Sequence, residues 1–99
     1  MSMLSSAYAE SVNKVAIVSD ASKMGDKAYV PNPLTIKQGD TVKWINKDFG
    51  LHAVTENNGL FGSDDLRPDQ TFEHSFVSSG TFDCHCEIPP SMTGIVIVK

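Results

Sequence analysis

The chain has 99 residues, of which 40% are hydrophobic, and a net charge of −4. This is enough apolar material for one domain with a single core, and too little chain for a second. Its eight Lys and Arg residues are scattered, which argues against a nucleic-acid or anionic-membrane surface, and no apolar run approaches the roughly 18 residues of a membrane span.

The first eleven residues are predicted to form a flexible tail, and residues 12–99 the domain. Ala7-Tyr8-Ala9 has the small-x-small form of a signal-peptidase site, although the charged and apolar regions that normally precede it are missing. Two interpretations stay open: a remnant of an export signal, or an ordinary disordered tail.

From residue 12 onward, short segments of strand character alternate with turn residues. Pro31 and Pro33 bar regular pairing and mark the start of a strand. No segment shows a 3.6-residue period, so the pattern predicts an all-β fold, a Greek-key antiparallel β-sandwich of seven to eight strands. The expected strand regions are residues 12–19, 34–46 (with a turn at 38–40), 51–55, 71–77, 81–86 and 93–99.

The stretch GTFDCHCEIPPSMTG, residues 80–94, contains the only two cysteines. Strand alternation places Cys84 and Cys86 on the inward face with Phe82, and His85 on the opposite face. Two prolines then end the strand, and a tight loop returns the chain at Met92, beside Cys86. Soft sulfur ligands favour copper, and His52 is the natural imidazole donor.

Two segments, GDTVKWINKDFGLHAVT (39–55) and GTFDCHCEIPPSMTGIVIV (80–98), together resemble the cupredoxins, the small blue copper proteins of the plastocyanin and amicyanin type. The resemblance covers nearly the whole chain from Val12. It implies one copper ion per chain in a type 1 site, with His52, Cys86 and Met92 as its ligands.

The sequence departs from the family pattern within this loop. Relatives usually read Cys-x-x-His-Pro-x-Met, but this chain reads CEIPPSM, with Pro89 where the second imidazole would stand. Water or an exogenous small molecule could take that position. His85 could do so only through a local bulge or a remodelled loop, because strand alternation points it to the opposite face. Cys84 could do so only through distortion, because same-face neighbours on a strand lie about 6.5–7 Å apart.

The resemblance implies an electron carrier between larger redox proteins rather than an enzyme, exported to the periplasm or another extracytoplasmic space, and monomeric. A competing hypothesis uses the open position at Pro89: a copper-dependent redox enzyme, or a site for a small ligand such as nitric oxide, nitrite or a halide. A third is that the departures leave a metal carrier or a bare scaffold.

Two side chains have plain structural interpretations. Cys84 by itself is most simply a small core hydrophobe. His74, between Phe72 and Phe76, is interpreted as a half-buried strand residue with a satisfied hydrogen bond.

Overall fold

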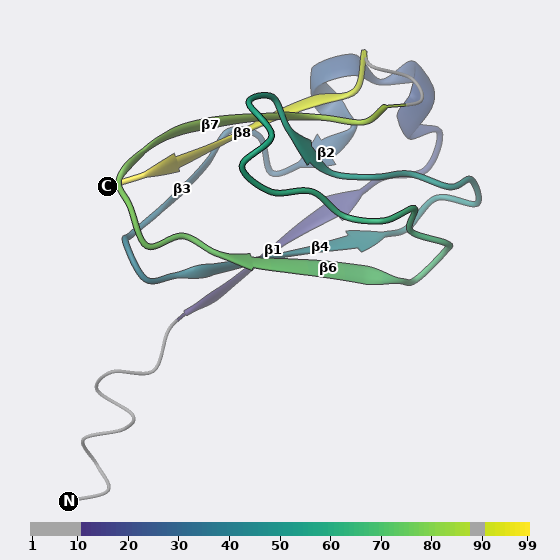
Figure 1. The fold of residues 1–99 in the computed structure, drawn as a ribbon. Coiled ribbons are helices and arrows are strands. Elements are labelled where there is room, and N and C mark those ends of the chain that lie inside the picture. Colours follow the sequence, from purple (N-terminus) through teal and green to yellow (C-terminus); the bar gives the residue numbers. More distant parts are fainter. Residues whose placement is uncertain (1–10, 88–90) are drawn as a thin grey trace, which may run out of the picture.

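The computed structural model describes residues 11–87 and 91–99, and these form a two-layer β-sandwich (Figure 1). The expected tail lies outside the described residues, except for Ser11, whose carbonyl accepts a hydrogen bond from the Thr41 amide. The described chain therefore already pairs with a strand at Ser11.

Each sheet has four strands. The first has the order β2-β1-β4-β6 and the second β3-β8-β7-β5. The first sheet contains β1 (Val12–Ile17), β2 (Tyr29–Val30), β4 (Thr41–Asn46) and β6 (Thr71–Ser75). The second contains β3 (Leu34–Ile36), β5 (Thr55–Glu56), β7 (Gly80–His85) and β8 (Thr93–Val98). Two 3₁₀ turns, η1 (Ala21–Lys23) and η2 (Gly25–Lys27), connect β1 to β2. Within residues 11–87 and 91–99, no helix is long and apolar enough to cross a membrane.

The predicted sandwich of seven to eight strands is confirmed, with eight strands, but both sheets are mixed rather than antiparallel. β1 pairs in parallel with β4, from Val12 opposite Thr41 to Ile17 opposite Asn46, and β3 pairs in parallel with β8. Between β1 and β4 the chain passes through β2 and then β3 in the other sheet, so β4 starts beside the start of β1. Alternation of apolar and polar residues is the same for either strand direction, so the sequence pattern did not distinguish the two pairings.

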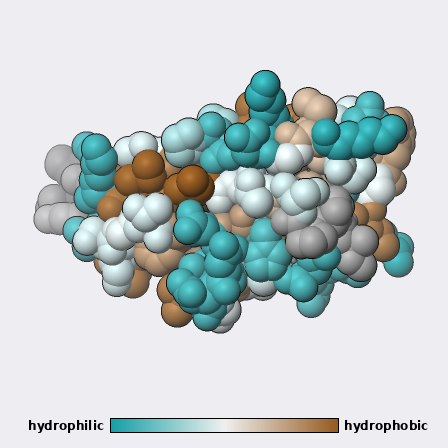
Figure 2. Space-filling view, turned by 90° about the horizontal axis from the view of Figure 1, so that it is seen from above, coloured by the Kyte–Doolittle hydropathy of each residue, from teal (hydrophilic) through white to brown (hydrophobic). Residues whose placement is uncertain are grey.

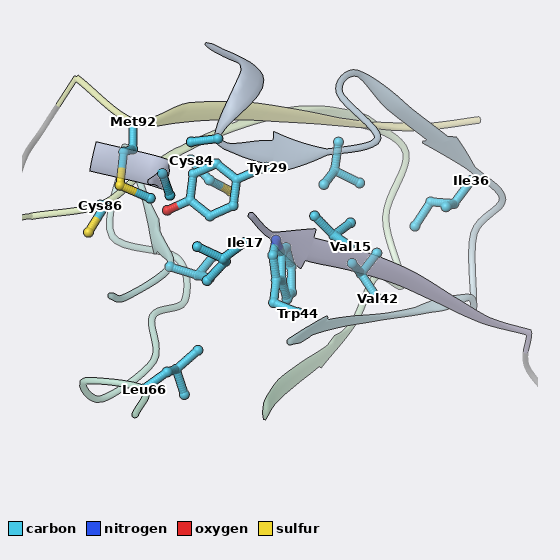
Figure 3. Close-up of a cluster of buried hydrophobic side chains, with 14 of the residues drawn as sticks. Val15, Ile17, Tyr29, Ile36, Val42, Trp44, Leu66, Cys84, Cys86 and Met92 are labelled. Atoms are coloured by element: carbon cyan, nitrogen blue, oxygen red, sulfur yellow. The ribbon is translucent and has the colours of Figure 1, made fainter. Parts of the chain in front are cut away.

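The core lies between the sheets, where the inward positions of the strands meet (Figure 3). Trp44 stacks on Phe72 with ring centroids 5.6 Å apart, and Phe61 and Phe76 extend this aromatic group. His74 is half-buried on β6, as expected, and its ring stacks on Phe61 at 4.1 Å. Its ring also meets Phe76 edge-on at 4.8 Å, while the expected hydrogen bond of His74 stays a prediction.

The residues of the candidate site lie at one end of the sandwich. β1 and β4 both end there, at Ile17 and Asn46, while β7 ends at His85 opposite the start of β8. Connecting segments from both sheets meet at this end (Figure 1). The outer face seen in Figure 2 is mainly hydrophilic, with hydrophobic side chains in small separate groups.

Candidate metal centre

Cys86 follows directly after β7 and is buried, with 2% of its surface exposed. Its backbone N–H donates to the Met92 carbonyl at 3.1 Å, which closes the return loop and brings Met92 beside it. The Met92 side chain is fully buried, at the same end of the core as Cys86 (Figure 3). Pro89 lies outside the described residues, as do Ile88 and Pro90.

His52 reaches the same place from the segment between β4 and β5. Its backbone forms a two-way bridge with Leu66, with N···O distances of 3.1 and 2.7 Å. The side chain is buried, and its Nδ1 lies 3.9 Å from the Cys86 sulfur. Two residues that are 34 positions apart are thus brought together, as the sequence analysis expected.

Asp48 orients the His52 ring. The Asp48 Oδ2 atom lies 2.7 Å from His52 Nε2, and only 13% of its side chain is exposed. This hydrogen bond with His52 is the main cause that lowers the pKa of Asp48 below its ordinary value, so the carboxylate is ionised and accepts. An ionised carboxylate can only accept, so it favours the tautomer with its proton on Nε2, and in that tautomer the Nδ1 lone pair faces Cys86.

Asn46, at the end of β4, holds the loop that carries Asp48. It is completely buried, and its Nδ2 donates to the carbonyls of Gly50 and Leu66 at 2.8 Å each. Its Oδ1 accepts from the Asp48 N–H at 2.9 Å. Because a buried amide is costly to leave unpaired, this network favours one arrangement of the His52 loop.

Tyr29, from β2, supports the site from the core. Its hydroxyl donates to the carbonyl of Ala53, the residue after His52, at 2.7 Å. The hydroxyl points to the same end of the core as Cys86 and Met92 (Figure 3). Burial, followed by the proximity of Cys86 and Cys84, raises the pKa of Tyr29, so the phenol stays neutral.

The side chains of His85 and Cys84 do not line the pocket that His52 and Cys86 share. The His85 ring lies 2.6 Å from both Asn57 Oδ1 and Glu87 Oε2, on the opposite face of β7 from Cys86. Cys84 is a buried free thiol that lines a cavity of about 420 Å³ together with Asp83, Thr93 and Gly94. Cys86 lines a different pocket, shared with His52.

The donors suit a soft metal ion. An ion about 2.0 Å from an imidazole nitrogen and about 2.3 Å from a thiolate sulfur fits between donors up to about 4.3 Å apart, and the His52–Cys86 separation is 3.9 Å. In the described part of the chain, no cluster of three or more His, Cys, Asp and Glu side chains could hold a metal. The buried Met92 thioether is a further soft donor at the same end of the core.

Sequence reasoning missed Asn46 as a site residue, as well as Asp48 and Tyr29. A carboxylate four residues before a candidate histidine ligand was a usable signal for Asp48. For Asn46 the signal was weaker: a polar residue at an inward-facing position at the end of β4. The link from Tyr29 to Ala53 joins segments far apart in the chain, and nothing in either segment indicates it.

Comparison with known proteins agrees with this architecture. No protein-family model matches the chain. It is 37% identical to amicyanin from Paracoccus denitrificans over 85% of its own length, and 30% identical to amicyanin-alpha from Methylorubrum extorquens over 91%, covering 80% of that protein. The chain spans 66% of the Paracoccus denitrificans protein and 58% of amicyanin from Paracoccus versutus, less than two thirds of either.

Among solved structures, the chain is similar to a purple cupredoxin from Nitrosopumilus maritimus, with a TM-score of 0.81 and 30% identity over 88% of this chain and 99% of that one. It is also similar to the Cu(I) form of an amicyanin variant, with a TM-score of 0.76 and 28% identity, covering 92% of this chain and 85% of that one. The chain belongs to the cupredoxin family.

Proposed function

We propose that residues 12–99 bind one copper ion through His52, Cys86 and Met92, and that the protein carries single electrons between larger redox proteins. The observation that carries the proposal is the 3.9 Å approach of His52 Nδ1 to the Cys86 sulfur, with the ring proton held away by Asp48. Copper would supply the exchange between its Cu(I) and Cu(II) states. The buried donors and the Asn46 network keep the site geometry constant during that exchange.

We further propose that the protein works as a monomer outside the cytoplasm. The resemblance to exported copper carriers supports this, as does the Ala7-Tyr8-Ala9 pattern, which lies outside the described residues. Fractionation of the native cells and sedimentation of the purified protein test the two statements separately.

The copper ligands are tested by titrating the apo-protein with Cu(II) while recording optical and paramagnetic resonance spectra. We expect one equivalent to bind, with intense visible thiolate-to-copper bands. Cys86→Ser should abolish the bands and Met92→Leu should shift them. Cys84→Ala should leave them in place, and equal loss in this variant would contradict the proposed ligand set.

A small-ligand site is the second candidate function, and one observation favours it. His52 and Cys86 open into a pocket of about 250 Å³, lined also by Leu51, Ala53, Asp65 and Glu87. Pro89 has no side-chain donor, and His85 is already engaged by Asn57 and Glu87. A water or small molecule from the pocket is therefore our proposed fourth ligand, and a shift of the visible bands on adding imidazole is the test.

A further inference from the structure

The pocket that His52 and Cys86 line carries acidic side chains. Its two ionisable lining residues besides the ligands are Asp65 and Glu87, and both are acidic. Asp48 adds a third carboxylate behind His52. No Lys or Arg occurs among the described residues that line it.

The two carboxylates differ in their partners. Glu87 accepts a hydrogen bond from His85 Nε2 at 2.6 Å and keeps 63% of its side chain exposed, so it stands at the mouth of the pocket. Asp65 is exposed and directly precedes Leu66, whose backbone bridges to His52. The carboxylates therefore belong to the two segments that carry Cys86 and support His52, one on each side of the pocket.

We propose that Asp65 and Glu87 make this pocket selective for neutral or cationic small ligands and disfavour anions. The inference rests on the proposed copper function, because it names the class of ligand that reaches the open coordination position. It disfavours nitrite and halides as ligands of this site. A charged pocket lined by low-dielectric side chains concentrates molecules of opposite charge and repels those of like charge.

The size of the effect follows from the charges and their exposure. A unit charge at the mouth of a partly solvated pocket changes the affinity of a charged ligand by about three- to tenfold at low salt. Salt screens such interactions, with a Debye length of about 10 Å at 0.1 M and about 3 Å at 1 M. The discrimination should therefore shrink as salt is added, whereas affinity for a neutral ligand should not change.

The first test needs no copper. In apo-protein carrying Cys84→Ala, Cys86 is the sole thiol, and its rates of modification by a cationic and an anionic methanethiosulfonate are compared at low salt. We expect the cation-to-anion rate ratio to exceed that of the urea-unfolded variant by about tenfold or more. Asp65→Asn with Glu87→Gln should remove most of this excess, and Glu73→Gln, an exposed carboxylate on β6, should not.

The second test uses copper-loaded protein at pH 8, titrated with azide as the anion and imidazole as the neutral ligand. Asp65→Asn and Glu87→Gln should each tighten azide binding about three- to tenfold and change imidazole binding less than twofold. Equal changes for both ligands, or an azide affinity that neither substitution alters, would overturn the proposal. So would a Cys86 that neither reagent modifies, because the pocket would then admit no ligand.

The two tests separate this inference from the copper function. If the protein fails to bind copper, the rate ratio at Cys86 still reports the charge of the pocket. If copper binds and neither azide nor imidazole perturbs its spectrum, no small ligand reaches the copper. The selectivity inference then fails, while the electron-carrier proposal stands.

Discussion

At the scale of single residues, the two cysteines differ in their surroundings although they lie two positions apart. Cys86 shares a pocket with His52, whereas Cys84 is only 3% exposed, lines a different pocket and pairs with Glu56 across β5 and β7. Burial raises the pKa of Cys84 to about 12, with Glu56 and Asp83 contributing further. The two thiols therefore differ in reactivity because their surroundings in the fold differ.

The Cys84 thiol is predicted to resist alkylation in the folded protein. In a Cys86→Ser variant, which leaves Cys84 as the only thiol, a pKa of about 12 means that only about one thiol in ten thousand is ionised at pH 8. Iodoacetamide labelling followed by mass spectrometry measures this. The same variant in urea, where the thiol is exposed, should label readily, and rapid labelling without urea would show that Cys84 is accessible.

Asp48 is predicted to set the metal affinity of His52. Replacing it with Asn removes the charged acceptor of the Nε2 proton, so the ring is no longer held in the tautomer that leaves Nδ1 open. Loss of such an orienting partner typically costs about 10- to 100-fold in metal affinity. Competition against a Cu(I) chelator measures the change. Asp69→Asn, at an exposed carboxylate paired with Lys47, serves as the charge-matched control and should have little effect.

At the scale of elements, β8 and β2 approach closely behind the site. A Cβ added at Gly94 would lie 3.2 Å from the Tyr29 ring, closer than a side chain normally packs. The absence of a side chain at Gly94 therefore lets Tyr29 sit where its hydroxyl reaches Ala53.

Gly94→Ala should destabilise the apo-protein by about 1–3 kcal/mol, because the ring and its hydrogen bond must shift. Urea unfolding measures this. Gly62→Ala is the matched control: its added Cβ would make only ordinary contacts, 3.6 Å or more away, and it should cost less than about 1 kcal/mol. Equal costs for the two variants would show that the approach of β8 to Tyr29 is unimportant.

The aromatic packing of β6 predicts a pH dependence of stability. Burial against Phe61 and Phe76 lowers the pKa of His74 below its ordinary 6.5. The unfolded chain then binds a proton more readily than the folded protein, so stability falls as the pH drops below about 6.5 and levels off below the folded pKa.

This contribution is isolated by comparing two proteins at two pH values. Between pH 7.5 and pH 5, the free energy of unfolding of the apo-protein should fall more for wild type than for His74→Gln. The substitution also changes packing, but that change is common to both pH values and cancels. An identical fall in the two proteins would rule out His74 as a source of the pH dependence.

At the scale of the whole molecule, the site joins both sheets and should couple metal binding to folding. Met92 and Cys86 flank the loop between β7 and β8. Asn46 from β4 holds the segment around His52 through the carbonyls of Gly50 and Leu66, and Tyr29 from β2 bonds the carbonyl of Ala53. An ion bound to these donors therefore stabilises the folded state alone, since the unfolded chain does not hold the donors together.

Copper is accordingly predicted to raise the melting temperature. At Cu(I) concentrations 100 times the dissociation constant, binding adds about 2.7 kcal/mol, which corresponds to roughly 10–20 °C in a domain of this size. Calorimetry under anaerobic conditions measures the shift. Cys86→Ser should abolish it, and Cys84→Ala should retain it at a lower starting temperature. An equal shift in all three proteins would mean that copper binds elsewhere.

Much of the fold and the candidate site could be predicted from the sequence, because the features concerned are local. The two-residue period of a strand is enough to place Cys84 and Cys86 inward and His85 outward, and the structure has them so. Two prolines after Cys86 require the strand to end before Met92. The ordered resemblance over residues 39–55 and 80–98 then indicates the cupredoxin family, and the position of Pro89 predicts which donor is missing.

Tertiary structure decided the features that depend on segments distant in the chain. The parallel pairing of β1 with β4, the bridge from His52 to Leu66 and the hydrogen bond from Tyr29 to Ala53 all join segments that are far apart in the chain. The same holds for the separate cavities of Cys84 and Cys86 and for the acidic rim of Asp65 and Glu87. Residue patterns specify which side of a strand faces the core, but only packing selects the partner that each side chain meets there.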